Sequence, residues 1–278
     1  CIIPKVRGDY RSVPMEELCR EAGELAEGGV KELILVAQET TLYGVDLYGE
    51  KKLPELLTKL CRIEGLCWIR ILYCYPEEIT DELIEVMKRE RKICHYLDIP
   101  IQSGSDRILK LMGRKTSRQQ ICERIQKIRE QIPDICIRTT LISGFPGETQ
   151  EDHEDTMSMV DEMEFDRLGV FPYSPEEDTP AAEMPDQLSE EIKQRRRDEI
   201  MELQQEIAFA SAGLMAGKMT EEDVYVARTY KDAPSVDGYL FIDTNRNFMS
   251  GDFVKVMITG SNEYDLIGEI ADDDTGRE

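Results

Sequence analysis

The chain has few basic residues relative to its acidic ones, and it has no hydrophobic run long enough to cross a membrane. Lys and Arg number 34 against 57 Asp and Glu, which gives a net charge of −23. Free nucleic-acid binding draws on many Lys and Arg contacts to phosphate, so this charge disfavours it. No apolar run approaches the ~18 residues of a spanning helix, and no signal-peptide pattern is visible. We expect a cytoplasmic protein with a basic partner, or one that is acidic merely for solubility.

Closely spaced metal-ligand motifs are also missing. The eight cysteines are scattered and include no CxxC pair, which excludes a zinc ribbon and a thioredoxin-type site. Several of them lie inside apolar strand or helix patterns, as reduced and buried thiols do. The two histidines, His95 and His153, have no partner at ligand spacing, so we expect surface or core roles for both.

Strand-like and helix-like segments alternate along residues 14–212. The short apolar runs are typical of parallel strands covered on both faces, and the segments between them have helical periodicity. The expected strands are 33–37, 68–75, 96–101, 135–142 and 168–171, and the expected helices are 14–28, 53–63, 80–89, 117–131, 150–164 and 188–212. Their order indicates parallel βαβ units. One further strand before Cys1 would make six, so the sequence predicts a partial (β/α)6 barrel.

The last part of the chain has a different pattern. After Gly213, short strand-like runs punctuated by Gly, Asn and Asp predict a small all-β barrel. The expected domains are therefore residues 1–213, a barrel with a C-terminal linker helix, and residues 214–278. Residues 214–278 contain six Lys and Arg against fourteen Asp and Glu, a net charge of −8. In the linker helix, the triplet 195–197 is basic but has acidic neighbours, which favours a solvated helix face.

Polar groups follow three of the predicted strands. Residues 141–149 contain two glycines three positions apart between a strand and a helix, a pattern that lets the backbone approach a ligand closely. Residues 99–105 and 38–41 end two other strands with amides and hydroxyls. Each segment alone is compatible with an ordinary turn or helix cap. Together they indicate a site at the C-terminal rim of the barrel, where such folds carry their chemistry.

The chain begins on a cysteine, with no methionine before it. A cysteine just after the first barrel strand lies on the face that carries chemistry in such folds. We therefore expect Cys1 to be one ligand of a metal site whose other ligands lie upstream, and the chain to be a fragment.

Several segments resemble the radical SAM methylthiotransferases. Residues 1–12 resemble the end of the CxxxCxxC loop of that family, with Cys1 at the third cysteine, and residues 99–113, 141–149 and 171–174 resemble it too. Residues 227–238 and 264–269 resemble the TRAM domain of the members that methylthiolate the β-carbon of an aspartate in small-subunit ribosomal protein S-twelve. The acidic tail favours this protein substrate over tRNA. A tRNA adenosine methylthiotransferase and a non-catalytic β/α scaffold with an acidic interaction module remain the alternatives.

The resemblance implies a [4Fe–4S] cluster held by three cysteines, with S-adenosyl-L-methionine on its open iron and cleaved reductively. A second cluster in the full-length enzyme supplies sulfur, and an electron donor is needed. By position, Cys1 is a cluster ligand, and the S-adenosyl-L-methionine pocket is expected at Gln38, Gln102, Ser103, Arg138, Gly144 and Glu148. One thiolate cannot hold a four-iron cluster, so we expect this chain alone to be inactive. Residues 213–220 are shorter than the family's connection to the TRAM domain, so a strand of that barrel is expected to be missing.

Overall fold

The computed structural model describes residues 2–212, 224–244, 246–262 and 265–271. Their contacts divide the chain into two compact units, residues 1–204 and residues 205–278. The division falls inside the long helix α9 (Glu190–Ala212), and the predicted domain boundary at 213/214 stays a prediction.

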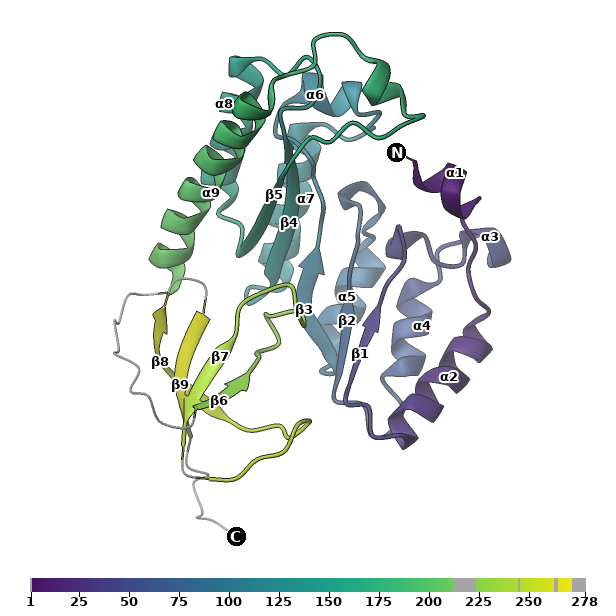
Figure 1. The fold of residues 1–278 in the computed structure, drawn as a ribbon. Helices are drawn as coiled ribbons and strands as arrows, with labels where there is room; N and C mark the ends of the chain where they lie inside the picture. The colour runs from purple at the N-terminus through teal and green to yellow at the C-terminus, as the bar shows by residue number, and fades with distance from the viewer. Residues whose placement is uncertain (1, 213–223, 245, 263–264, 272–278) are drawn as a thin grey trace. The chain divides into compact units, whose positions relative to one another are not determined.

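Unit 1 contains a parallel sheet of five strands in sequential order (Figure 1). The strands are β1 (Glu32–Leu35), β2 (Trp68–Ile71), β3 (Ile93–Asp98), β4 (Cys136–Ser143) and β5 (Arg167–Pro172). The main helices are α2 (Met15–Glu27), α4 (Leu53–Leu60), α5 (Asp81–Arg89), α6 (Asp106–Leu111), α7 (Arg118–Gln131) and α8 (Gln150–Met163). Short helices are α1 (Ile3–Arg7), α3 (Val45–Tyr48), η1 (Thr40–Leu42), η2 (Pro76–Glu78) and η3 (Pro180–Glu183). The predicted parallel α/β organisation is confirmed.

Strand β4 has one fully buried face and one more open face. Along β4, burial alternates with the period of two that a strand imposes, so that Arg138, Thr140 and Ile142 are half-buried between fully buried neighbours. The helices pack beside one another, with α4 in contact with α2 and α5, and α5 in contact with α7. Isoleucines and leucines such as Ile69, Ile71 and Leu57 are fully buried and form the core. None of the described helices combines the length and apolarity that a membrane span requires.

Two of the predicted strands end earlier than expected, each at a backbone irregularity. The strand predicted at 68–75 ends at Ile71 because Tyr73 has a φ of 58°, which extended backbone excludes. The strand predicted at 96–101 spans Ile93–Asp98, because Pro100 has no N–H for a ladder bond and Gln102 has a φ of 75°.

The described residues of unit 2 form four strands, β6 (Val224–Ala227), β7 (Leu240–Asp243), β8 (Val256–Asn262) and β9 (Asp265–Ile270). Among the described residues they form one mixed sheet in the order β6-β7-β9-β8, in which β7 and β9 are parallel. Leu240 and Ile242 are buried. The small β domain predicted for this region is thus present as a sheet. The expectation of a missing strand at residues 213–220 lies outside the described residues.

Candidate functional site

The loops after the five strands of unit 1 meet at the C-terminal edge of the sheet. This edge, called the rim below, comprises residues 36–41, 72–75, 99–105, 144–148 and 173–174. Backbone hydrogen bonds join neighbouring loops: the N–H of Thr40 donates to the carbonyl of Tyr73 at 2.9 Å, and that of Cys74 donates to Asp98 at 2.8 Å. The N–H of Tyr173 donates to Ser143 at 2.8 Å. The rim is therefore a continuous structure, as the sequence predicts for parallel strand ends.

Arg138 lies on the open face of the sheet just below the rim and pairs with a buried carboxylate. Its Nη1 is 3.0 Å from Oδ1 of Asp98, which is 3 % exposed, and 3.3 Å from the Thr140 hydroxyl. The other carboxylate oxygen of Asp98 accepts the N–H of Tyr73 at 3.3 Å. A ligand carboxylate that binds Arg138 would therefore share the guanidinium with Asp98.

The side chains of the two predicted glutamines are accessible at the rim. Gln38 is exposed after β1, and Gln102 is half-buried after β3. The backbone of Gln102 is fixed on both sides, because its N–H donates to Thr140 at 2.9 Å and its carbonyl accepts from Ile142 at 2.9 Å. The exposed side chains of Val36, Tyr73 and Phe171 add apolar surface at the same ends of β1, β2 and β5.

Ser103 faces helix α8 and not the open side of the rim. It is 1 % exposed, its hydroxyl accepts the N–H of Ser105 at 3.1 Å, and it lies 3.4 Å from the hydroxyl of Thr156. The neighbouring Gly104 approaches α8 so closely that a Cβ there would lie 2.7 Å from Cα of Thr156. The glycine thus permits the loop to pack on the helix, and Ser103 holds it there.

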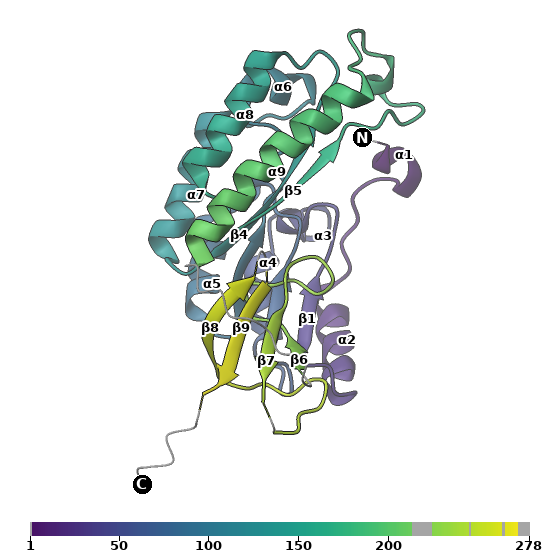
Figure 2. The ribbon, with the colours of Figure 1, turned by 60° about the vertical axis from the view of Figure 1, so that its left-hand side comes forward.

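Gly144 and Glu148 are held against helix α9, which lies alongside α8 (Figure 2). Oε1 of Glu148 accepts the N–H of Gly144 at 3.0 Å and the guanidinium of Arg196 at 2.7 Å. Burial raises the pKa of Glu148, and the Gly144 N–H and Arg196 oppose that rise. The expectation of a solvated basic triplet is wrong for Arg196, which is 5 % exposed between the exposed Arg195 and Arg197.

Glu39 is the rim carboxylate that the sequence did not single out. It is 4 % exposed, and its carboxylate accepts the N–H of Thr41 at 3.0 Å and that of Tyr75 at 2.9 Å. Burial raises its pKa to about 7, although the Thr41 and Tyr75 hydrogen bonds lower it. The sequence shows that this strand end is polar, but it does not show which of its side chains turns inward.

Replacing Glu39 with Gln is expected to reduce the pH dependence of the stability of unit 1. The unfolded chain releases this proton near the ordinary pKa of 4.5 and the folded chain near about 7, so the folded state holds the extra proton between these values. The contribution of Glu39 to the free energy of unfolding is therefore most favourable at low pH, and it falls by about 1–3 kcal/mol as the pH rises through these values. Urea unfolding from pH 5 to 8, followed by Trp68 fluorescence, measures this fall in the wild-type protein and in the variant. Equal slopes for both proteins would contradict the role of Glu39.

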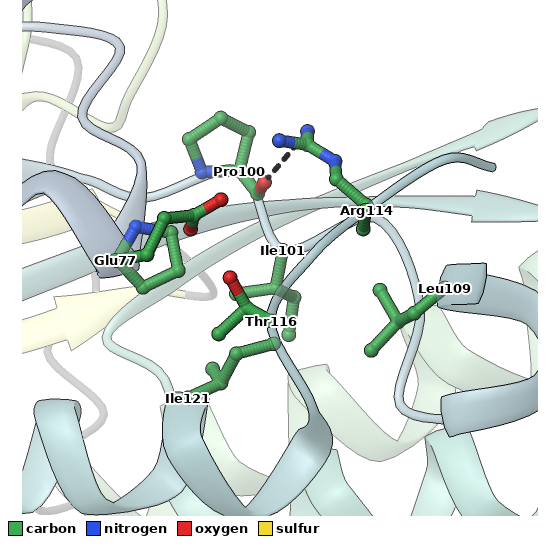
Figure 3. Close-up of a pocket in the computed structure, with 8 residues that line it drawn as sticks. Glu77, Pro100, Ile101, Leu109, Arg114, Thr116 and Ile121 are labelled. Atoms are coloured by element: carbon green, nitrogen blue, oxygen red, sulfur yellow. Dashed lines mark hydrogen bonds between the residues drawn. The ribbon is translucent and has the colours of Figure 1, made fainter.

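A small pocket lies beside the rim and is lined by Glu77 of η2 and by Pro100 and Ile101 of the rim, among others (Figure 3). Arg114 closes one side of the pocket. Its Nη2 donates to the carbonyl of Pro100 at 3.3 Å, and its Cζ lies 4.3 Å from the ring centroid of Tyr75. The hydroxyl of Thr116 is buried and has no hydrogen-bond partner among the described residues. The pocket has room for about one water molecule, which makes it too small for a nucleoside.

The described part of the chain contains no cluster of three or more His, Cys, Asp or Glu side chains that could hold a metal ion. It does not by itself fit an iron–sulfur cluster. Cys1, the predicted ligand, lies outside the described residues. Among the described cysteines, Cys74, Cys94, Cys122 and Cys136 are buried, and no disulfide is formed. Burial raises the pKa of the Cys74 thiol well above its ordinary value, which disfavours the thiolate that binds metals.

Comparisons with known proteins agree with this architecture. Residues 1–160 match the Radical SAM superfamily, and residues 214–271 match the TRAM domain. The fold resembles that of coproporphyrinogen III oxidase (HemN) from Escherichia coli, a radical SAM enzyme, with a TM-score of 0.51 and 20 % identity over 69 % of this chain and 46 % of that one. At this identity the likeness concerns the fold.

Two relatives are much more similar in sequence. The ribosomal protein uS12 methylthiotransferase RimO of Lachnoclostridium phytofermentans is 61 % identical over 96 % of this chain. The RimO of Clostridioides difficile is 48 % identical over 97 % of it. The chain spans 63 % of the length of each of these relatives. Since the superfamily match covers more than half of the chain and the parallel sheet agrees with it, the chain belongs to the radical SAM superfamily.

Proposed function

We propose that the chain provides the radical SAM and TRAM regions of a methylthiotransferase that modifies the β-carbon of an aspartate in ribosomal protein uS12. The observation that carries this proposal is the 61 % identity to a RimO enzyme, which extends through both units. A protein that acts on ribosomal components works in the cytoplasm, and this localisation is part of the proposal.

The cofactors of this proposal are S-adenosyl-L-methionine and two [4Fe–4S] clusters, one of them with Cys1 as a ligand. When bound and reduced by an electron donor, the first cluster supplies the electron for reductive cleavage of S-adenosyl-L-methionine. The accessible Gln38, Gln102 and Arg138 are suited to direct contact with this polar ligand, and the apolar rim surface is suited to its adenine. Ser103, Gly144 and Glu148 are suited to an indirect role, because their contacts hold the rim loops on α8 and α9.

Gln102 and Arg138 offer different chemistry to the ligand. The amide of Gln102 both donates and accepts hydrogen bonds, as recognition of a ribose or an adenine edge requires. Arg138 donates only and suits a carboxylate. Because Asp98 already neutralises Arg138, its attraction for an added carboxylate is weaker than that of a lone guanidinium. In this proposal, Gln102 and Arg138 thus bind and orient S-adenosyl-L-methionine at the rim.

Unit 2 is proposed to dock the basic ribosomal protein. Two exposed acids, Asp243 on β7 and Glu269 on β9, are partners across the parallel pair. Like charges placed side by side repel each other, so a cationic partner would relieve that repulsion. Other acids of this unit have internal roles: Asp232 is 1 % exposed and accepts the N–H of Thr229 at 3.1 Å, and Asp265 accepts that of Tyr239 at 2.8 Å.

Reversing both exposed acids, with Asp243→Lys and Glu269→Lys, is expected to slow association with uS12 about tenfold at low salt and less at high salt. Stopped-flow binding across a salt series measures this. Asp252→Lys reverses one exposed acid of the same unit that does not belong to the pair, a charge change of +2 against +4 for the double variant, and serves as the control. Equal slowing by the control would indicate general repulsion, and no slowing by the double variant would argue against docking on this face.

The activity itself is tested by completing the chain with those residues of the Lachnoclostridium phytofermentans relative that it does not match. After anaerobic iron and sulfide reconstitution, the product is incubated with uS12, S-adenosyl-L-methionine and a reductant. Mass spectrometry should find one methylthio group on an aspartate of uS12. Modification of a tRNA adenosine in its place would support the alternative function of a tRNA adenosine methylthiotransferase. If the completed protein bound no iron, the result would support a non-catalytic scaffold.

A further inference from the structure

Tyr73, the second residue after β2, has a backbone conformation that residues other than glycine rarely adopt. Its φ is 58°, in the left-handed region, and the residue is 44 % exposed. Because strand side chains alternate between the two faces, an uninterrupted strand would place residue 73 on the same face as Ile69 and Ile71, which are fully buried. The turn at Tyr73 therefore takes a large aromatic ring away from the buried face of β2 and leaves it exposed at the rim.

Hydrogen bonds from both neighbouring strand ends fix this turn. The carbonyl of Tyr73 accepts the N–H of Thr40 at 2.9 Å, and its N–H donates to Oδ2 of the buried Asp98 at 3.3 Å. The residue before it is held too, because the Thr40 hydroxyl donates to the carbonyl of Leu72 at 2.6 Å. On the other side, the N–H of Cys74 donates to the carbonyl of Asp98 at 2.8 Å. A strained residue persists only where its surroundings fix it in this way, and such residues concentrate at functional sites.

Asp98 also joins Tyr73 to Arg138. Its Oδ1 binds Nη1 of Arg138 at 3.0 Å, while its Oδ2 accepts the N–H of Tyr73. On the opposite side, Arg138 lies close to Phe171, because a Cβ at Gly169 would be 3.7 Å from Nη2 of the arginine and 3.7 Å from Cε2 of the phenylalanine. In the strand order of Figure 1, Arg138 thus has one aromatic residue toward β5 and another toward β2.

One adenine cannot contact both of these aromatic residues. Strands β2 and β5 are three positions apart in the sheet, which corresponds to about 14 Å along it at the usual spacing of about 4.8 Å. For a ligand whose carboxylate binds Arg138, Phe171 is the apolar surface that the structure places next to it. The exposed Tyr73 and Val36, at the ends of β2 and β1, are then left for a different ligand.

In the proposed function this other ligand is the protein substrate, because its aspartate must lie beside the S-adenosyl-L-methionine with which it reacts. We propose that the ring of Tyr73 packs on the segment of uS12 that carries this aspartate. Exposed aromatic rings are common anchors of protein–protein contacts, and a ring whose backbone is already fixed loses little conformational entropy when it binds. The inference rests on the proposed function and adds a specificity-determining residue to it.

Two variants remove the ring without adding backbone strain. Asn and Gly both tolerate a positive φ, so Tyr73→Asn and Tyr73→Gly leave the turn intact. Tyr73→Phe keeps the ring and removes only the hydroxyl. Phe171→Asn removes an exposed ring at the β5 end of the rim and is the matched control. Urea unfolding, followed by the fluorescence of Trp68 on β2, first establishes that each variant is folded.

Stopped-flow binding of uS12 to the chain as it stands, without any cofactor, measures the contact. Dissociation should be roughly three- to tenfold faster in Tyr73→Asn and Tyr73→Gly, and within about twofold of wild type in Tyr73→Phe and Phe171→Asn. Because the ring is uncharged, this factor should be the same at low and high salt, whereas the charge reversals on unit 2 slow association in a salt-dependent way. Equilibrium dialysis with S-adenosyl-L-methionine is the second readout, in which Tyr73→Asn should match the wild-type chain.

Unchanged dissociation in both variants that lack the ring would overturn the contact. Equally fast dissociation of Phe171→Asn would also overturn it, since the effect would then be general to the rim. Equally fast dissociation of Tyr73→Phe would show that the hydroxyl and not the ring is recognised, and weaker S-adenosyl-L-methionine binding by Tyr73→Asn would assign the ring to the cofactor; either result overturns the proposal. If the wild-type chain does not bind uS12, the proposed function fails first and this inference fails with it, whereas normal wild-type binding with unchanged variants rejects the inference alone.

Discussion

Replacing Arg196 with Ala is expected to destabilise unit 1 by about 3–5 kcal/mol, because it leaves the buried carboxylate of Glu148 without its cation. Arg196 donates from Nη1 to the carboxylate at 2.7 Å and to the backbone carbonyl of the same residue at 3.0 Å. For a domain of this size the midpoint of thermal unfolding should fall by about 6–20 °C. The fluorescence of Trp68, the one tryptophan of the chain, follows unit 1 alone.

The same helix provides the controls. Arg195 and Arg197 flank Arg196, and their side chains are 60 % and 44 % exposed. Their replacement with Ala removes the same charge and should change stability by less than about 1 kcal/mol. If all three variants were equally stable, the ion pair would have no structural role. The double variant Arg196→Met with Glu148→Gln removes both charges and should recover part of the loss.

Much of the fold could be predicted because its local signals agree with one another. The apolar runs and the helical periodicity located every strand and main helix of unit 1 except α6. The starts of two helices could also be predicted, because Ser117 and Thr149 each form a capping box with the residue three positions later. The strand ends near Tyr73 and Gln102 were misplaced, because a positive φ at a residue other than glycine leaves no mark in the sequence pattern.

The docking of α9 could not be predicted from periodicity. Its buried stripe contains Lys193, Arg196, Ile200, Gln204 and Ile207 at helical spacing, and three of these five are polar. Hydrophobic patterning detects only the two isoleucines, so the basic triplet at 195–197 was expected to be solvated. The partners are polar as well: Ser143 donates to the carbonyl of Lys193 at 3.0 Å. Such a polar seam depends on which elements meet, and that is known only from the fold.

The two histidines illustrate the same limit. The expectation of surface or core roles is confirmed, since His95 pairs with Asp134 at 2.7 Å near the surface. His153 is 3 % exposed, and its Nε2 lies 2.6 Å from the carboxylate of Glu199 on α9. The sequence favoured these roles but could not name the partners, which lie 39 and 46 positions away.

Replacing Gly144 with Ala is expected to destabilise unit 1 by about 2–5 kcal/mol, from a strained backbone together with overpacking. Its φ is 69°, and a Cβ there would lie 2.4 Å from Cγ of Lys193 and 3.2 Å from its Cα. Lys193 is 3 % exposed, so its stem has little room to move, and helix α9 itself must shift. The glycine is therefore required for packing on the helix, whether or not a ligand also approaches it.

A second variant, Gly147→Ala, separates the backbone strain from the overpacking. Gly147 lies in the same loop with a φ of 77°, and a Cβ there would meet no atom within 4 Å. Gly147→Ala should therefore show the backbone strain alone, about 1–2 kcal/mol. The difference between the two variants, measured by urea unfolding with Trp68 fluorescence, gives the contribution of the α9 contact. Equal losses would show that α9 yields freely at this point, and that close packing at Gly144 does not restrict the helix.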